Sequence, residues 1–299
     1  MLVRILKPLL HLVYSPLFWS NWLYVSNLVR PWWGNPTEIF WPQVTPTPVV
    51  LGALWSLCVE EQFYLVWPLL VLLLRSRKAI MYFSAAATVA VLCLRIGLYI
   101  HYPQKAMTTE YLYFATYTRC DGLFIGAFLA VWLRGTRLTN RAVYQVAGVL
   151  IGFPTISLLT ANGIFGGRWI GLIPPAQFSY EFTLVDLACA GVLLLAVDER
   201  TFLFRTLRVK GLAALGVISY GFYFFHGLPY LFIQHANVHF FAPYHLSPVL
   251  PLLVFAVTYL CAHLSYYYYE AYFLKLKNRL APGHRSVPSG VEAGATLSR

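Results

Sequence analysis

The sequence predicts an all-α, polytopic integral membrane protein with about eight transmembrane helices and both termini in the cytoplasm. Composition, the number of long apolar runs and the placement of basic residues support this prediction. Of the 299 residues, 59% are hydrophobic and 11% are charged, whereas about 25% are charged in an ordinary soluble domain. A single globular core of this size cannot cover so much apolar surface, so a lipid bilayer is the expected solvent.

Eight apolar runs are long enough to cross a bilayer, which takes about 20 residues. We expect transmembrane helices over residues 8–26, 55–74, 79–99, 111–133, 143–161, 179–197, 212–233 and 249–272. Residues 1–280 then form one membrane domain. Residues 281–299 are small and polar, so this cytoplasmic tail is expected to be disordered.

The basic residues indicate the direction of the helices. When the loops between the eight runs are assigned alternately to two sides, 17 of the 20 Lys and Arg residues in loops fall on one side. Cytoplasmic loops are enriched in Lys and Arg, so this side, which also holds both termini, is expected to be cytoplasmic. The net charge of +11 therefore belongs to loops and not to one basic face, and nucleic acid is not an expected partner.

The cysteines give no sign of a metal site or a disulfide framework. All five lie in or beside apolar runs, and none forms a CxxC pair. Small buried hydrophobes are the ordinary role of such residues. We expect no metal and no permanently bound cofactor.

Few ionisable side chains lie inside the predicted helices. A charge at the centre of a membrane helix costs at least about 2.5–3.5 kcal/mol, so such residues mark candidate functional sites. Those that we single out are Glu60, Glu61, Arg95, Arg119, Asp121, Asp186 and His226. A rise of ~1.5 Å per residue places them all in the outer half of the membrane, with Glu60 roughly 8 Å and His226 roughly 10 Å from the outer edge. The common depth predicts a polar chamber that opens to the outer face.

Helical spacing groups the candidate residues by face. Ser56, Glu60 and Tyr64 share one stripe, whereas Glu61 points about 100° away. In the run at 111–133, Tyr117 and Asp121 share a face, and Arg119 lies on the face of Gly122 and Gly126, whose GxxxG spacing allows close helix approach. In the run at 212–233, the shared stripe consists of Ser219, Tyr223 and His226.

Structural roles are the alternative for several of these residues. Arg119 could pair with an acid only to fix helix packing, and His226 could be a hydrogen-bonded core histidine. Glu61 could be an acid at the membrane interface. These alternatives stay open at the level of residue pattern.

Four segments resemble one protein family. They are "LWSLCVEEQFYLVWPLL", "TYTRCDGLFIGAFLA", "LGVISYGFYFFHGLP" and "SYYYYEAYFLKLKNRL". They are similar to the W-S-L-x-x-E-E-Q-F-Y, T-x-x-R-x-D-G-L-x-x-G-A, L-G-x-x-S-Y-x-x-Y-x-x-H and S-Y-x-x-x-E-x-P-F motifs of the bacterial membrane O-acyltransferases of the acyltransferase family 3 type. Ala271 and Tyr272 stand where the last motif has other residues.

The resemblance implies transfer of an acyl group, typically from cytoplasmic acetyl-CoA, to a hydroxyl of a surface glycan or lipid at the outer face of the bacterial plasma membrane. It places Glu60, Arg119, Asp121 and His226 among the catalytic candidates. The remaining candidates would line the substrate chamber: Ser56, Glu61, Tyr64, Tyr117, Ser219 and Tyr223. A transporter or flippase that moves a polar substrate through the same chamber is the alternative function, although no inverted repeat is visible.

The N-terminal region departs from the family pattern. Family members begin with two further helices and an L-D-G-L-R-G-x-A-A…H segment whose histidine is the presumed base, and nothing in residues 1–50 matches that segment. His11 lies near the cytoplasmic end of its run, far from the outer cluster. Residues 1–299 alone are therefore expected to insert into a membrane but to transfer no acyl group, because general-base assistance is worth roughly 10²–10⁴-fold in rate.

Overall fold

The structure is a computed structural model that describes residues 27, 54–102, 112–134, 136, 138–164, 175–226 and 249–280. The chain divides into two compact units. The first unit consists of residues 1–47 and 54–205, and the second of residues 48–53 and 206–299. Every regular element among the described residues is a helix, which confirms the predicted all-α class for that part of the chain.

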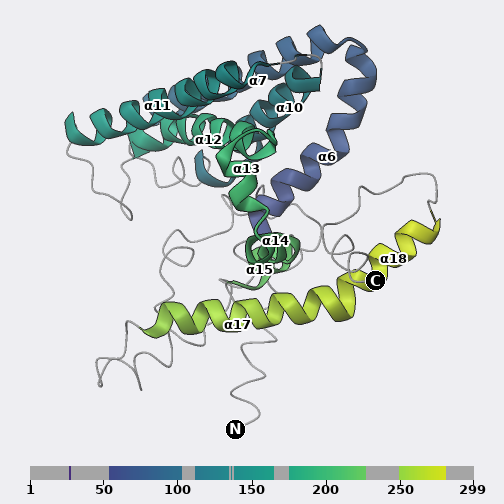
Figure 1. Cartoon of the computed structure of the whole chain (residues 1–299). Coiled ribbons are helices and arrows are strands. Elements are labelled where there is room, and N and C mark those ends of the chain that lie inside the picture. The colour runs from purple at the N-terminus through teal and green to yellow at the C-terminus, as the bar shows by residue number, and fades with distance from the viewer. Residues whose placement is uncertain are drawn as a thin grey trace, which may run out of the picture. The chain divides into compact units, whose positions relative to one another are not determined.

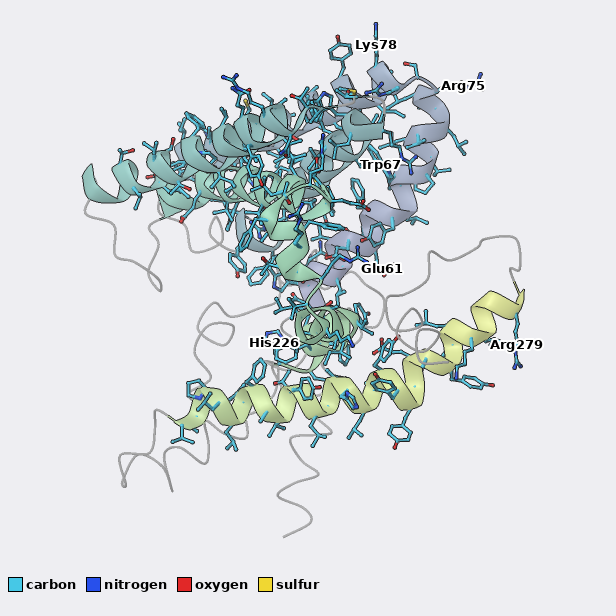
Figure 2. The ribbon with its side chains drawn as sticks, in the orientation of Figure 1. Glu61, Trp67, Arg75, Lys78, His226 and Arg279 are labelled. Atoms are coloured by element: carbon cyan, nitrogen blue, oxygen red, sulfur yellow. The ribbon has the colours of Figure 1, made fainter. Side chains whose placement is uncertain are left out.

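The first unit begins with a hairpin of two long helices, α6 (Leu54–Leu74) and α7 (Arg77–His101). Arg75, with φ of 53°, occupies the left-handed region between them, and Ser76 caps α7 by accepting a hydrogen bond from the amide of Ala79 at 3.1 Å. Figure 2 shows Arg75 and Lys78 together at this turn. Polar capping residues thus end one apolar helix and begin the next.

Helices α7, α10 (Asp121–Arg134), α11 (Asn140–Ile164) and α12 (Pro175–Val197) run side by side (Figure 1). Their buried apolar cluster consists of Ile125, Leu129, Val143, Ala147, Ala190 and Leu194. A Cβ at Gly191 would lie 2.8 Å from a side-chain carbon of Ile151, so the absent side chain lets α12 approach α11 closely. Beyond α12, the short helix α13 spans Phe202–Leu207.

The second unit contains α14 (Lys210–Val217), α15 (Ser219–Phe225) and α17 (Leu250–Ser265). The chain continues from α17 through one π-helical turn, η4 (Tyr266–Glu270), into α18 (Ala271–Leu280). A Cβ at Gly221 would lie 3.3 Å from the Cα of Ala262, so α15 and α17 pack closely there.

Five helices of the described residues are long and apolar enough to cross a membrane. They cover Trp55–Leu74, Arg77–His101, Asn140–Thr160, Ser179–Val197 and Leu250–Leu276, and agree with five of the eight predicted runs to within a few residues. Only 11–22% of each apolar window is buried inside the protein, which suits helices that are solvated by lipid.

Two other predicted runs are interrupted. The run at 111–133 is broken at Cys120, between the four-residue helix α9 (Thr116–Arg119) and α10. The run at 212–233 is broken at Ile218, and its part beyond His226 lies outside the described residues. The run at 8–26 and the tail at 281–299 also lie outside them. The count of eight helices and the cytoplasmic termini stay predictions.

Candidate functional site

The break at Cys120 organises the polar centre of the first unit. Helix α9 ends at Arg119, Cys120 has φ of −82° and ψ of −1°, and α10 starts at Asp121. Tyr117 is 43% exposed whereas Asp121 is fully buried. The two residues that helical spacing places on one face therefore lie in different environments, and their common face stays a prediction. The break directs consecutive polar side chains into different environments.

Arg95 of α7 and Asp121 of α10 form a buried ion pair, and neither side chain has any exposed surface. The two nitrogens of the guanidinium fork donate to the two carboxylate oxygens, at 3.1 Å from Nη1 to Oδ1 and 2.6 Å from Nη2 to Oδ2. The other donors go to the Ser179 carbonyl at 3.1 Å, the Thr118 carbonyl at 2.6 Å and the Thr183 hydroxyl. A guanidinium has five N–H groups, and all five of Arg95 are used.

Thr183 completes this cluster, because its hydroxyl donates to Oδ2 of Asp121 at 2.7 Å while it accepts from Arg95. The carboxylate of Asp121 therefore accepts three hydrogen bonds inside the protein. The cluster joins α7, α10 and α12 at one point. A buried pair of this kind is strongly destabilised when one partner is removed.

Arg119 has a different environment, made of aromatic rings. Its guanidinium carbon lies 3.7 Å from the ring centre of Phe182, 5.7 Å from that of Trp55 and 5.8 Å from that of Tyr113. Cation–π attraction holds a guanidinium in such a setting. Asp186 supplies an opposite charge nearby, with no ion pair to Arg119 among the described residues.

The guanidinium of Arg119 forms no hydrogen bond within the part of the chain that the structure describes. Its side chain is only partly buried. None of its nitrogens is among the buried atoms of the described residues that lack a partner. A guanidinium whose N–H groups make no hydrogen bond to the described residues has the donors needed to bind a carboxylate, a phosphate or an oxyanion.

A closed ring of three hydrogen bonds connects α9 to α6. The amide of Asn27 donates to the hydroxyl of Thr116, this hydroxyl donates to the amide oxygen of Gln62, and the amide of Gln62 donates back to Asn27 at 3.0 Å. Asn27 is fully buried. Each of the three side chains thus both donates and accepts, so that the ring ties the start of α9 to the middle of α6.

Glu60 and Glu61 lie on α6 beside Gln62 and differ in environment. Glu60 is half-buried. Glu61, labelled in Figure 2, is exposed. Ser56 is half-buried on the stripe of Glu60, and Tyr64 is 55% exposed. The predicted stripe therefore runs from the protein interior to its surface.

Ser219, Tyr223 and His226 belong to the second unit. The hydroxyl of Ser219 donates to the Gly216 carbonyl at 2.8 Å. His226, at the end of α15 (Figure 2), has Nδ1 within hydrogen-bond reach of the Tyr223 carbonyl and its ring 5.4 Å from the Tyr223 ring. The structure describes each unit by itself, so the predicted common chamber of His226 and Glu60 stays a prediction.

Of the two glycines with GxxxG spacing, Gly122 is closely approached by a neighbouring helix and Gly126 is not. A Cβ at Gly122 would lie 2.9 Å from Oδ2 of Asp186, whereas a Cβ at Gly126 would meet nothing within 4 Å. Sequence reasoning identified Arg95 as an intramembrane charge but not its partner. It missed Thr183, Asn27 and the ring role of Gln62, because uncharged polar side chains are common in helices and only contacts between helices make them informative.

No group of three or more His, Cys, Asp or Glu side chains is placed to hold a metal ion within the described residues. The side chains of the first unit that could take part in chemistry are instead carboxylates, the Arg119 guanidinium and several hydroxyl groups. Such groups can orient a hydroxyl and stabilise negative charge, which are the requirements of acyl transfer to an alcohol.

Comparison with protein families identifies the chain. The model of the acyltransferase domain, Acyl_transf_3, matches residues 2–267. The chain belongs to the acyltransferase 3 family. The segments with the buried pair, the hydrogen-bond ring and Arg119 all lie inside the matched range, so the features of the first unit are features of an acyltransferase 3 domain.

Curated relatives carry acetyltransferase names. YrhL of Bacillus subtilis strain 168, provisionally named a peptidoglycan O-acetyltransferase, is 27% identical over 273 residues, which cover 88% of this chain and 40% of that protein. The O-acetyltransferase OatA of Staphylococcus aureus strain NCTC 8325 / PS 47 is 27% identical over 261 residues, which cover 84% and 39%. The peptidoglycan O-acetyltransferase OatA of Listeria monocytogenes is 29% identical over 217 residues, which cover 69% and 32%.

The chain thus spans about two fifths of the length of the Bacillus subtilis and Staphylococcus aureus relatives. No solved structure matches it.

Proposed function

We propose that this protein is an O-acetyltransferase of the bacterial plasma membrane that transfers an acetyl group from cytoplasmic acetyl-CoA to a hydroxyl of a surface glycan. The proposal rests on the match of the acyltransferase domain to residues 2–267. The names of the relatives favour peptidoglycan as the acceptor. A lipid hydroxyl is the other acceptor class to be tested.

The residues of the first unit suit this reaction. A hydroxyl is a poor nucleophile at neutral pH and needs a base. We assign to Glu60 the orientation and polarisation of the acceptor hydroxyl, and to Arg119 the binding of negative charge on the acyl group or the acceptor. We propose that Asp121 supports the site indirectly and does not contact the acceptor, since its carboxylate is hydrogen-bonded to Arg95 and Thr183.

The other candidates are proposed to line the substrate chamber. From the first unit these are Ser56, Glu61, Tyr64 and Tyr117. From the second unit they are Ser219, Tyr223 and His226.

The acid pair provides a test with an internal control. Membrane vesicles with the product of the native gene would receive labelled acetyl-CoA and peptidoglycan, and labelled acetyl ester would be measured. Glu60→Gln keeps the size of the side chain but removes its charge, and it should lower the rate by roughly 10²–10⁴-fold. Glu61→Gln makes the same change at the exposed neighbour and should have little effect.

Two outcomes would contradict the proposal. Normal transfer by Glu60→Gln would make Glu60 a structural residue. Absence of acetyl transfer, combined with passage of labelled glycan across the vesicle membrane, would establish the transporter alternative instead.

A second preparation limited to residues 1–299 tests the prediction that these residues alone transfer no acyl group. The same labelled donor and acceptor would be used. Acetylation that disappeared in His226→Ala would overturn this prediction and identify His226 as the base.

A further inference from the structure

Helix α9 is held from two sides although it has only four residues, Thr116–Arg119. On one side the ring of Asn27, Gln62 and Thr116 ties its first residue to α6. On the other side Arg95 donates to the carbonyl of Thr118 at 2.6 Å. A helix this short has almost no stability of its own, so these contacts determine its position.

We propose that the ring of Asn27, Gln62 and Thr116 positions Arg119 for acetyl transfer, so that Gln62 and Thr116 are positioning residues of the reaction. This inference rests on the proposed function. Arg119 is the half-buried last residue of α9, and its contacts among the described residues are aromatic rings, which restrain its plane but not its position along the ring face. The ring of hydrogen bonds supplies the missing restraint.

The ring also links the two residues to which we assign the chemistry. Gln62 stands two positions after Glu60 on α6, and Thr116 stands three positions before Arg119 on α9. The hydrogen bond from Thr116 to Gln62 therefore joins the two helices at points close to both residues. A misplacement of about 1 Å can cost on the order of 10²-fold in rate.

The hydrogen-bond ring of Asn27, Gln62 and Thr116 requires a polar side chain at each of its three positions. Each member both donates and accepts one hydrogen bond around the circle, so any member replaced by an apolar side chain leaves a donor and an acceptor unmatched. Asn27 is fully buried, and water does not replace a lost partner easily at such a place. A hydroxyl at 116, not merely a side chain of similar size, is thus required.

The first experiment measures kcat and KM of acetyl transfer with Thr116→Val and Thr116→Ser in the native gene product. We expect Thr116→Val to lower kcat on the order of 10²-fold with little change in the KM of acetyl-CoA, and Thr116→Ser to restore it. Thr155→Val is the matched control, because the Thr155 hydroxyl donates only to its own helix, to the Ile151 carbonyl at 2.7 Å. Equal kcat values for the three variants would overturn the proposal.

A double-mutant cycle separates positioning from general loss of structure. If Thr116 acts through Arg119, Thr116→Val should have little further effect on kcat in an Arg119→Met background. The same fold-loss in both backgrounds would overturn the proposal. Should Thr116→Val fail to fold, Asn27→Ala opens the ring at its far side and enters the same cycle, with a smaller expected loss.

Hydrogen exchange tests the restraint independently of activity. The amides of Thr118 and Cys120 donate within α9, to Ala115 and Thr116, and should exchange faster in Thr116→Val than in Thr155→Val. Equal exchange in the two variants would overturn the proposal. If the unmodified protein transferred no acetyl group, the proposed function would fail while this measurement still decided whether the ring holds α9.

Discussion

Arg95 and Arg119 lie in the same helical unit and both face the ring of Phe182, but their other contacts differ. Arg95 is completely buried and its five N–H groups reach a carboxylate, two carbonyls and a hydroxyl. Arg119 is partly exposed, lies against Phe182, Trp55 and Tyr113, and donates to no described residue. An arginine inside a membrane is therefore not by itself a sign of chemistry. The N–H groups that make no hydrogen bond to described residues distinguish Arg119, the candidate for function, from Arg95, the structural residue.

The difference follows from the elements that surround each residue. Arg95 projects from α7 towards the polar start of α10 and towards α12, where Asp121, Thr183 and two carbonyls are within reach. Arg119 ends α9 beside aromatic side chains, which attract a cation without using its N–H groups. Two residues of the same type thus differ in their hydrogen bonding: all N–H groups of Arg95 are bonded, and those of Arg119 are bonded to no described residue.

The largest expected effect comes from breaking the buried pair. Arg95→Met leaves Asp121 buried without its counter-charge and should lower the free energy of unfolding by roughly 3–5 kcal/mol. Thermal unfolding in detergent or nanodiscs measures this. The double variant Arg95→Met/Asp121→Leu, which removes both charges, should recover much of the loss. A double variant as unstable as the single one would contradict the assignment of the pair as the cause.

The second test removes the other guanidinium. Arg119→Met keeps an apolar contact with Phe182 and should change the free energy of unfolding by only about 0.5–1 kcal/mol. Acetyl transfer should fall by roughly 10²–10³-fold, the usual effect of removing one donor to developing negative charge. Lys78→Met, at the turn between α6 and α7, serves as the control. Normal transfer by Arg119→Met, or a stability loss as large as that of Arg95→Met, would erase the contrast between the two arginines.

A third test concerns the glycine that separates the two sites. A Cβ at Gly122 would lie 2.9 Å from Oδ2 of Asp186, so Gly122→Ala must displace the acid beside Arg119 and should destabilise by roughly 1–3 kcal/mol. Gly126→Ala meets nothing within 4 Å and should be neutral or stabilising by up to about 1 kcal/mol, because alanine favours helix. Unfolding temperatures of the two variants make the comparison, and equal values would be evidence against a close approach at Gly122.

The smallest effect is expected at an exposed pair outside the predicted membrane helices. Hydrogen bonds from Arg200 lower the pKa of Asp198 from 3.8 to about 2. A lowered pKa means that this pair stabilises the fold at pH above about 4 and that its contribution is lost as the pH falls towards 2. Titration of the Asp198 carboxylate by NMR measures the pKa. Arg200→Gln should return it to the usual range, and an unchanged value would exclude Arg200 as the cause.

The amino-acid sequence alone determined the class and the family. Apolar runs of membrane-spanning length are a one-dimensional property of the chain, and five of the predicted runs match helices of the structure. Intramembrane charges are also visible one residue at a time, so Glu60, Arg95, Arg119 and Asp121 could be singled out before any fold was known. The family motifs around these residues are continuous stretches of sequence, so they can be identified without a structure.

Only the tertiary structure decided which of these charged side chains is hydrogen-bonded inside the protein, as Arg95 is, and which makes no hydrogen bond to described residues, as is the case for Arg119. Arg95 and Asp121 are 26 residues apart and meet only because α7 and α10 pack together, while Thr183 reaches them from α12. Tyr117 is 43% exposed and Asp121 is fully buried, a difference that helical spacing within one run could not predict. The physical reason is that hydrogen-bond satisfaction depends on partners from other helices, whereas periodicity describes a single helix.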